Sequence, residues 1–367
     1  MKNIIVVSNL YPSKDRPYFG TFVKNSVRTL EDNGWDVTVF ALPFYGRGFL
    51  GYLKFYAATF IHLLSFNGIV YVHYISHSVL PVLLSLVFNR NAKIVLHYHG
   101  SDAFSGINES ITRVFFKRKI CQIANAFAIK FISPSQLFAQ RLQKKFGIPE
   151  KSLFVSPSGG VNTRTFFPPQ ANQQNNKNSV RCLFVSRMIP GKGAKEVALI
   201  IQQLLTKKGA PQIEATLIGS GPEQADVKEA LALYIEQDKC RIIDASSQAE
   251  IAAEFRKTDI FLFPSFREGE SLGLVLIEAI FCGAIPLVID CGAVREVLPN
   301  NTHTSLIAPD IKQYENALTN LINLLQDNNN KCRLQEQLKQ ITPIYEEKNV
   351  ALALSNLMQE IEDTHAG

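Results

Sequence analysis

Short apolar runs rich in β-branched residues alternate along the chain with longer segments that carry apolar residues on one face. Each run has the length of a buried parallel strand, and the segment after it has helical spacing. In residues 21–33, for example, Val23, Val27 and Leu30 share one helix face and Gly34 stops the helix. In the first half, the pattern predicts strands at 2–8, 36–42, 68–73, 92–98, 126–132 and 153–156, and further helices at 49–66, 79–88 and 136–146.

A second alternation of the same kind begins at residue 180. It predicts strands at 180–186, 212–218, 241–243, 259–263 and 284–289 with helices between them, and a helical remainder from 312 onward. The polar tract 169–179 between the two halves has the composition of a linker. We therefore expect an α/β protein of two doubly wound domains facing across a cleft, with residues 1–168 in the first and 180–367 in the second. The final helix is a candidate for crossing back to the first domain.

The stretch 263–278, FPSFREGESLGLVLIE, concentrates candidate chemistry in the second half. It predicts a strand, a tight loop and a helix, with Glu270 just before the helix and Glu278 about two turns into it. Exposed amides at a helix start attract an anion, and two fixed acids can hold hydroxyl groups. A surface loop followed by a core helix with an incidental acid is the plainer alternative, but an acid within an apolar run is costly to bury without partners.

Two cations follow the first strand of the second half. Arg187 comes directly after it, and Lys192 lies in the loop that leads to the next helix. Since the carboxyl ends of parallel strands share one edge of a sheet, both should converge with Glu270 there. Arginine grips a phosphate with two donors and lysine acts as a point charge, so the set suits a diphosphate with a sugar at one end and a nucleoside at the other.

Two positions in the first half also follow expected strands. Gly20 closes a loop before a helix, where it could let a phosphate approach the backbone; a simple helix-entry glycine is the alternative. His99 lies beside Gly100 and Asp102 at the end of the strand 92–98, where ligands bind in open α/β sheets. An ordinary hydrogen-bonded histidine is the alternative there.

Charge is divided unevenly between the halves. Residues 1–168 hold 19 Lys+Arg and 7 Asp+Glu, a net +12, whereas residues 169–367 hold 19 and 25, a net −6. A basic half indicates an acidic partner such as an anionic lipid, or only a solvated basic surface, and no nucleic-acid module accompanies it. Residues 49–66 could pack on the sheet or lie on a membrane surface. Residues 113–119 (RVFFKRK) could touch lipid headgroups or form a charged helix face with both rings turned to the core.

Targeting segments and cysteines bear on the cellular compartment in which the protein works. No secretory signal opens the chain, and no apolar run approaches the ~20 residues of a spanning helix. The six cysteines are scattered without a CxxC pair, and no histidine has metal-ligand spacing to them, which favours free thiols in a reducing cytosol and no metal site.

Taken together, these motifs resemble those of the retaining glycosyltransferases of family 4, which have the two-domain GT-B architecture. The resemblance covers most of the chain, and Glu270-x7-Glu278 in the context ESLGLVLIEA is its most specific part. Leu272 stands where members commonly have Phe, and Glu268 is a second acid close to Glu270; the spacing to Glu278 favours Glu270. The remaining matches are the Gly20 loop, His99-Gly100, Gly160-Val161-Asn162, Phe167-Pro168, Arg187…Lys192-Gly193, Gly219-Ser220-Gly221-Pro222 and Cys282-Gly283.

The resemblance implies a role for each site residue. Arg187 and Lys192 would neutralise the donor diphosphate, Glu270 would hold sugar hydroxyls, Glu278 would hold the ribose, and His99 would join the catalytic set. The amides of the loop and helix start would meet the phosphates, and the donor-binding set is Gly20, Gly219, Gly269, Ser271, Leu272, Gly273, Leu274 and Glu278.

It also implies the reaction and its setting. The expected reaction is metal-independent, retaining transfer from a UDP- or GDP-linked sugar, without a cofactor, to a saccharide or lipid-linked acceptor. The expected setting is bacterial surface-polysaccharide or glycolipid synthesis in the cytoplasm, with association at the inner membrane face as a further expectation. A GT-B-fold sugar-nucleotide epimerase, a phosphorylase and a non-catalytic nucleotide-sugar-binding protein are the alternatives; no pyridoxal-binding lysine for a phosphorylase is identifiable.

Overall fold

The computed structural model describes residues 2–13, 19–42, 48–107, 109–169, 179–207, 209, 212–244 and 246–364. The chain forms two compact units: the first unit is Met1–Gly160 with Glu347–Gly367, and the second unit is Val161–Glu346. The changeover after Gly160 precedes the expected boundary at residue 168, because Val161 and Phe166 are buried in the core of the second unit. Most of the expected linker 169–179 lies outside the described residues.

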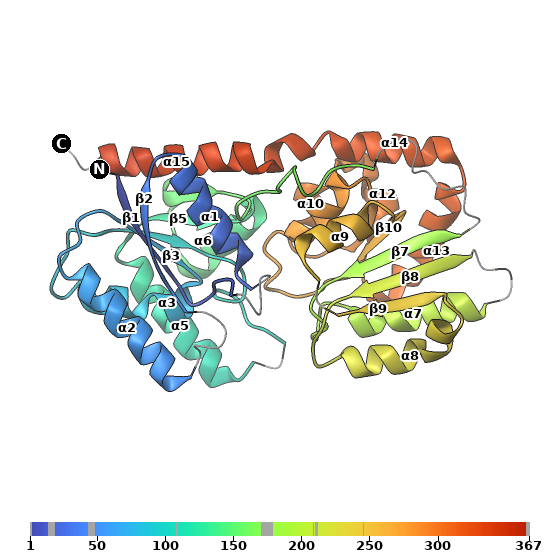
Figure 1. Ribbon diagram of the computed structural model, residues 1–367, viewed down its shortest axis with the longest axis horizontal. Helices are drawn as coiled ribbons and strands as arrows, with labels where there is room; N and C mark the ends of the chain where they lie inside the picture. The colour runs from blue at the N-terminus through green and yellow to red at the C-terminus, as the bar shows by residue number, and fades with distance from the viewer. Residues whose placement is uncertain are drawn as a thin grey trace. The chain divides into compact units, whose positions relative to one another are not determined.

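A six-stranded parallel sheet forms the centre of the first unit, in the order β2-β1-β3-β4-β5-β6 (Figure 1). The strand order reverses between β1 and β3, and open α/β sheets bind ligands beside such a point. The strands are β1 (Asn3–Ser8), β2 (Asp36–Ala41), β3 (Ile69–His73), β4 (Lys93–His97), β5 (Ala128–Ser133) and β6 (Leu153–Val155).

Alternate residues of these strands enter two separate cores. Ile5 and Val7 of β1 pack on one face, whereas Ile4 and Val6 pack on the other, as the two-residue period of a strand requires. The first face is covered by α2 (Phe49–Leu63), α4 (Leu80–Ser85), α5 (Ile111–Asn125) and α6 (Gln136–Phe146). The second is covered by α1 (Thr21–Asp32) and α15 (Glu347–Asp363).

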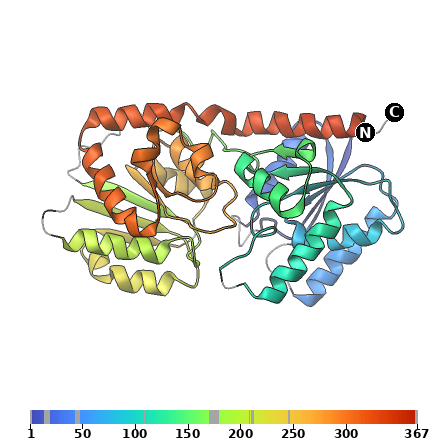
Figure 2. The ribbon, with the colours of Figure 1, turned by 180° about the vertical axis from the view of Figure 1, so that it is seen from behind.

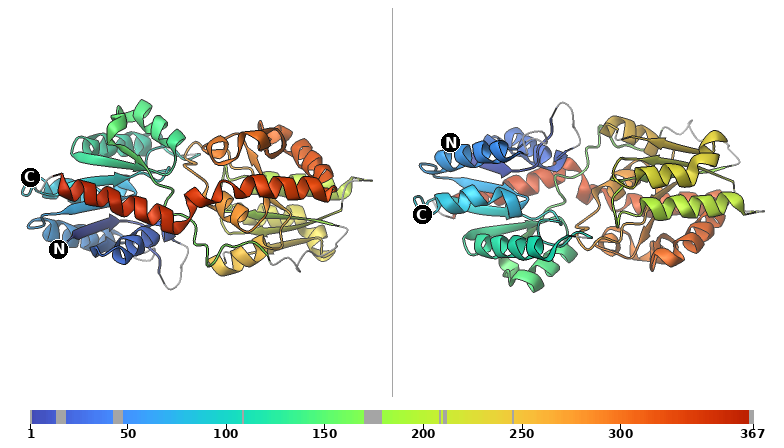
Figure 3. Two further views of the ribbon diagram at one scale, coloured as in Figure 1. Left: turned by 90° about the horizontal axis from the view of Figure 1, so that it is seen from above. Right: turned by 90° about the horizontal axis from the view of Figure 1, so that it is seen from below.

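The helix α15 brings the last part of the chain back to the first unit. Leu354, Leu357 and Met358 are buried in the core that contains Val23 and Leu30 of α1. Trp35 Nε1 donates to Ser355 Oγ at 3.2 Å, and Lys93 pairs with Glu362 at 2.8 Å. Seen from above, α15 runs across the first sheet (Figure 3). Residues of α15, which are distant in sequence from the rest of the first unit, thus complete this core.

The second unit has its own six-stranded parallel sheet, in the order β12-β11-β10-β7-β8-β9. This is the order typical of dinucleotide-binding folds, with the reversal between β7 and β10. Its strands are β7 (Val180–Val185), β8 (Ile213–Ile218), β9 (Cys240–Ile243), β10 (Ile260–Phe263), β11 (Ile285–Ile289) and β12 (Ile307–Ala308). Its main helices are α7 (Ala194–Thr206), α8 (Gln224–Glu236), α9 (Gln248–Phe255), α10 (Leu274–Phe281), α13 (Tyr314–Leu325) and α14 (Asn328–Lys339).

The expected fold class, two Rossmann-like doubly wound sheets, is confirmed. The sequence pattern missed the short helix α3 (Ile75–Ser78) and the two-residue strand β12, which pairs with β11. The expected depth of Glu278 is also wrong: α10 begins at Leu274, so Glu278 lies just over one turn along it.

Two apolar segments had alternative interpretations. The helix α2 packs on the sheet through a stripe of Phe55, Thr59 and Leu63 and leaves other apolar residues exposed. In α5, Phe115 and Phe116 are 55% and 64% exposed. The interpretation in which these two rings turn to the core is therefore wrong. Figure 2 shows α2 and α5 beside each other on the same side of the first unit.

Candidate functional site

The loops that follow β7 and β10 are joined at the point where the strand order of the second sheet reverses. The amide of Phe266 donates to the carbonyl of Gly191 at 3.0 Å. Gly193, which precedes α7, has φ 82°, and a Cβ there would lie 2.5 Å from Cγ of Pro264. No other residue fits without moving the two loops apart. The sequence brings both loops to one edge because each follows a strand of the same parallel sheet.

An ion pair links these loops. Lys192 Nζ lies 2.6 Å from Glu270 Oε2, and the Ser265 hydroxyl donates to the same carboxylate at 2.6 Å. The side chains of Lys192 and Glu270 are only 16% and 10% exposed. Burial alone would raise the pKa of Glu270, but the Lys192 ammonium and the hydrogen bonds from Lys192 and Ser265 outweigh it and hold that pKa below its usual value. The carboxylate is therefore an ionised acceptor in a fixed position.

Arg187 differs from Lys192 in its surroundings. It directly follows the end of β7 and its side chain is exposed. Among the described residues, Arg187 has no carboxylate partner, whereas Lys192 has Glu270. Of the two expected cations, Arg187 is thus the one whose charge remains available to an anion.

Glu278 is the second expected acid. It is half-buried in α10, between the core residues Ile277 and Ala279. Burial raises its pKa from 4.5 to about 7. A carboxyl group of this kind is costly to ionise unless hydroxyl or amide donors approach it. It is therefore suited to a ligand that supplies hydrogen-bond donors.

The remaining expected residues line the same loops. Gly219 follows β8, and a Cβ there would lie only 1.8 Å from the carbonyl oxygen of Ser186, so the β7 and β8 loops touch through backbone. Gly273 is the N-cap of α10 and Leu272 is 3% exposed. Ser271 and Leu274 flank them, and Gly269 lies in the turn in which the Glu270 amide donates to the Arg267 carbonyl. As at any helix start, the first amides of α10 have no intrahelical acceptor.

In the first unit, Gly20 and His99 lie at the carboxyl edge of the sheet. Gly20 is the N-cap of α1, and a Cβ there would lie 2.7 Å from the backbone of Leu10. The amides of His99 and Gly100 donate to the Asp102 carboxylate at 3.0 and 2.9 Å. Burial raises the pKa of Asp102 to about 6, against the opposing effect of these backbone hydrogen bonds. This turn fixes the backbone of His99.

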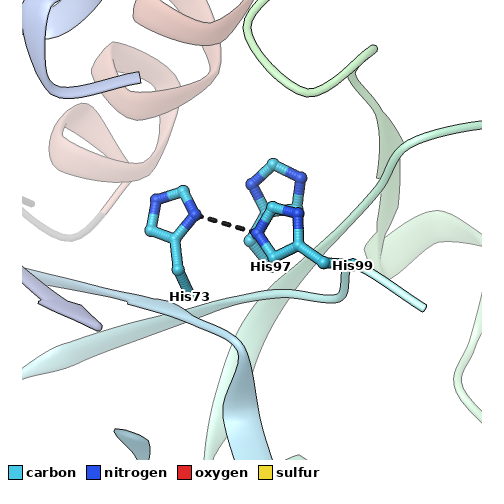
Figure 4. Close-up of side chains that lie close together, drawn as sticks. All are labelled: His73, His97 and His99. Atoms are coloured by element: carbon cyan, nitrogen blue, oxygen red, sulfur yellow. Dashed lines mark hydrogen bonds between the residues drawn. The ribbon is translucent and has the colours of Figure 1, made fainter. Parts of the chain in front are cut away.

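His99 belongs to a cluster of three imidazoles with His73 and His97 (Figure 4). His73 Nδ1 lies 3.0 Å from His99 Nε2, and the rings of His97 and His99 stack with centroids 4.1 Å apart. Burial lowers the pKa of His97 to about 3, and burial together with the neighbouring rings lowers the pKa of His73 and His99 well below the usual value. All three are neutral imidazoles at neutral pH. Within the described part of the chain, this cluster is the group of three side chains arranged closely enough to hold a metal ion.

Comparison with known sequences assigns the second unit. Residues 168–342 match the family described as "Glycosyl transferases group 1". This segment is a glycosyltransferase group 1 domain. It contains the loops after β7 and β10, which meet at the point where the strand order reverses (the switch point), and it also contains the Lys192–Glu270 pair and Glu278.

Curated proteins similar to this chain include sugar transferases of a yeast and of a bacterium. The chain is 25% identical over 166 residues to the phosphatidylinositol N-acetylglucosaminyltransferase gpi3 subunit of Schizosaccharomyces pombe, which covers 45% of this chain and 35% of the relative. It is 22% identical over 255 residues to N,N'-diacetylbacillosaminyl-diphospho-undecaprenol alpha-1,3-N-acetylgalactosaminyltransferase of Campylobacter jejuni, covering 67% and 64%. The chain thus spans from about a third to just under two thirds of the length of these relatives.

Solved structures share the fold over both units. Sucrose-phosphate synthase from Thermosynechococcus elongatus superposes with a TM-score of 0.75 at 17% identity, covering 99% of this chain and 100% of the other. HepE from Anabaena, in complex with UDP and glucose, gives 0.71 at 18% identity, covering 99% and 100%. These similarities show the GT-B fold.

Three residues around these sites were not expected from the sequence. Ser265, which holds Glu270, could have been noticed because it follows Pro264 directly after β10. His73 and His97 are register partners on adjacent strands, and His99 follows two residues after His97, just beyond the end of β4. The signal in the sequence was a pair of histidines one residue apart, His97-Tyr98-His99. Whether they form a cluster with a third histidine depends on which strand lies beside β4.

Proposed function

We propose that this protein transfers a sugar from a nucleotide diphosphate sugar to an acceptor hydroxyl with retention of the anomeric configuration. The observation that supports this best is the buried Lys192–Glu270–Ser265 arrangement at the switch point of a group 1 domain. It places an ionised acceptor for sugar hydroxyls beside cations and free helix amides. These are the groups that such a donor needs.

In this proposal, each residue has one role. Arg187 and Lys192 neutralise the diphosphate, and amides of the Gly269–Leu274 segment bind its oxygens. Glu270 accepts hydrogen bonds from the sugar and Glu278 from the ribose. Gly219 permits close approach of the β8 loop to the β7 loop. In the first unit, Gly20 and His99 line the edge at which an acceptor or donor group would bind.

The chemistry follows from these charges. As the bond between the anomeric carbon and the phosphate oxygen breaks, negative charge grows on the leaving diphosphate, and Arg187 with the α10 amides stabilises it. The acceptor hydroxyl attacks from the same face and its proton passes to the leaving phosphate oxygen, so no enzymic nucleophile is needed. We propose metal independence because no Asp-x-Asp pair, the usual carboxylate arrangement for a donor-bound cation, occurs anywhere in the sequence.

The donor base is proposed by analogy with a structural neighbour. HepE was solved with UDP and glucose, which supports a UDP-linked donor here ahead of a GDP-linked one. The names of two relatives specify a phosphatidylinositol and a diphospho-undecaprenol acceptor. They support a lipid-linked saccharide or glycolipid acceptor, as in bacterial surface-polysaccharide synthesis, in preference to a soluble sugar.

The surface of the first unit supports a lipid setting. Apolar side chains on α2, at the C-terminal end of α4 and on α5 are exposed although they are of core type. The rings of Phe60 and Phe88 pack at 5.9 Å, which joins α2 to the segment after α4. We call these residues the apolar rim: Phe49 (83% exposed), Leu50, Leu53, Ile61, Leu84, Val87, Phe88, Ile111 (87%), Phe115, Phe116 and Ile123.

The charged residues in the sequence around the apolar rim are mostly basic. From residue 37 to residue 149 the sequence contains just two acids, Asp102 and Glu109, among twelve Lys+Arg. Asp102 is buried, and Glu109 pairs with Lys117 at 2.7 Å. Lys117 is itself 9% exposed and also donates to the carbonyls of Ser101 and Phe104, so it is a structural residue and not a lipid contact.

We therefore propose that the protein works in the cytoplasm as a peripheral protein on the inner face of the membrane. The apolar rim would insert at the headgroup level, and Arg113, Arg118 and Lys119 of α5 would pair with anionic lipids. No helix in the described ranges is long and apolar enough to cross a membrane. The six cysteines are free thiols, which supports a reducing compartment.

One incubation tests the proposal. The protein is mixed with UDP- or GDP-linked sugars and a polyprenyl-diphosphate saccharide, with and without EDTA, and nucleotide release, product mass and the anomeric NMR coupling are followed. We expect nucleotide release that depends on the acceptor, a product heavier by one sugar, retained configuration and no effect of EDTA. Isomerised or hydrolysed donor without acceptor would identify an epimerase, and binding without turnover a sensor; either result rejects the proposal.

A further inference from the structure

The cluster of His73, His97 and His99 has a geometry that the proposed transfer does not require. His73 and His97 end adjacent strands and are paired in register, and His99 lies two residues beyond His97. One ring nitrogen from each residue lies within 4.8 Å of the other two. Three imidazoles from the ends of two strands and from the turn after β4 therefore converge on one place.

The cluster also contains polar atoms without partners. His73 and His97 are 0% and 1% exposed, and among the described residues neither Nε2 atom has a hydrogen-bond partner. Burying a ring nitrogen without a hydrogen-bond partner is unfavourable, so such atoms are uncommon in native proteins and call for an explanation such as a bound ion.

The surroundings orient these rings as they are oriented in metal sites. The hydroxyl of Tyr71, which is fully buried, lies 2.6 Å from His97 Nδ1, so that Nε2 is the nitrogen of this ring without a partner. Metal-binding histidines are commonly fixed in this way through their second nitrogen. The backbone of His99 is held by the Asp102 carboxylate. Two of the three ligands thus have rigid supports.

We propose that His73, His97 and His99 bind one transition-metal ion of the kind that prefers imidazole, with Zn²⁺ as the reference ion. Neutral imidazole is the ligand form, and three histidines with an open fourth position are a known zinc arrangement. His73 Nδ1 and His99 Nε2 are already 3.0 Å apart. Two bonds of 2.0–2.1 Å meeting at a tetrahedral angle would set the nitrogens about 3.3 Å apart.

A bound ion would join the ends of β3 and β4 to the turn at Asp102. It would replace the His73–His99 hydrogen bond by two coordinate bonds and satisfy the buried Nε2 atom of His97. The effect would be to stabilise the first unit. This inference does not depend on the proposed transfer, because its readout is metal content and stability.

Zinc retention by untagged, full-length protein provides the test. The protein is stripped with chelator, exposed to Zn²⁺, desalted and analysed for metal; Co²⁺ is substituted to give visible ligand-field absorption. Three variants remove one ligand each: His73→Phe, His97→Phe and His99→Gln. His62→Gln is the matched control, since His62 is an exposed histidine on α2 of the same unit.

We expect about one zinc per chain in the wild type and in His62→Gln, and at least a tenfold lower content in each cluster variant. Zinc should raise Tm in the wild type and the control only. His99 is partly exposed, so His99→Gln decides the question if a buried variant does not fold. Absence of zinc from the wild type, or equal retention by His99→Gln, would overturn the proposal and leave an imidazole hydrogen-bond chain.

Discussion

The two units present their candidate sites in opposite electrostatic forms. The second unit uses charges held in pairs: Lys192 with Glu270 at its switch point, and Asp259 with both Arg181 and Lys331 at the base of β10. The first unit has neutral histidines at its sheet edge, and its residues 37–149 carry twelve Lys+Arg against two acids. The second unit is thus suited to binding an anionic ligand at a site whose own charges are paired. The first unit is suited to binding an anionic surface.

The two arrangements differ most in the free-energy cost of a buried group that lacks its partner. A paired carboxylate such as Glu270 is stable only while its cation is present, because an unpaired buried charge is strongly unfavourable. Neutral imidazoles carry no such dependence, but they leave ring nitrogens without partners. Removing Lys192 should therefore have an effect that depends on whether Glu270 is still ionised.

The largest effect is expected for the exposed cation of the second unit. Arg187→Ala should lower kcat/KM by about a hundredfold or more, because a donor to the developing negative charge is lost. Stability should change little, since the side chain is exposed. Steady-state kinetics and thermal unfolding are the measurements, with Arg333→Ala, another exposed arginine of this unit, as the control. Unchanged turnover would remove Arg187 from the site.

The next effect tests the coupling of the ion pair. Lys192→Ala should reduce turnover and also destabilise the protein by about 2–4 kcal/mol, because Glu270 is left ionised without its cation. Adding Glu270→Gln should restore most of that stability and none of the activity. Urea unfolding and kcat/KM of the two single variants and the double variant measure this. A double variant no more stable than Lys192→Ala would show that the pair does not hold the loops.

A smaller effect is expected at the surface of the first unit. Replacing Arg113, Arg118 and Lys119 by Ser should weaken sedimentation with anionic vesicles at low salt by tenfold or more, since each base near such a surface contributes about 1 kcal/mol. The control replaces three exposed lysines of the second unit, Lys228, Lys239 and Lys312, which makes the same change in net charge. Equal loss in both variants, or no binding by the wild type, would contradict a specific lipid-facing surface.

The smallest effect concerns the pH dependence of stability. The folded state raises the pKa of Glu278 to about 7 from 4.5, so between these values it binds a proton that the unfolded chain has released. Stability therefore falls as pH rises from about 4.5 to about 7. Glu278→Gln removes that loss and should be the more stable protein at pH 8, by at most about 3 kcal/mol before solvent screening, with no difference near pH 4.5.

Urea unfolding at the two pH values measures this, with Glu229→Gln on the exposed face of α8 as the control. Nucleotide affinity gives an independent readout of the same residue. Glu278→Gln should weaken UDP binding because a neutral amide accepts ribose hydroxyls less strongly than a carboxylate. A variant that is no more stable than the wild type at pH 8 would contradict the buried, high-pKa state of Glu278.

Local patterns predicted most of the fold because apolar periodicity is set within each element. The helix α6 has the predicted bounds, Gln136–Phe146, because it has a serine N-cap and the C-cap Gly147. The helix α3 and the strand β12 were missed because four and two residues are too short to show a period.

The candidate sites divide in the same way. The Lys192–Glu270 contact was within reach of the sequence, since both loops follow strands that share an edge. The histidine cluster was not, because its meaning depends on β3 and β4 being neighbours in register. The direction of Phe115 and Phe116 was left open between lipid and core, because an apolar residue in a helix ordinarily indicates a core position.

The return of α15 to the first unit has a consequence for how the protein is made. The core around Trp35 lacks Leu354, Leu357 and Met358 until residues 347–363 have been synthesised. The ribosome therefore delivers every residue of the second unit before the first can close, although the first begins to emerge earlier. A domain that is translated first but finished last leaves the part of its sheet face that α15 covers exposed while its neighbour folds.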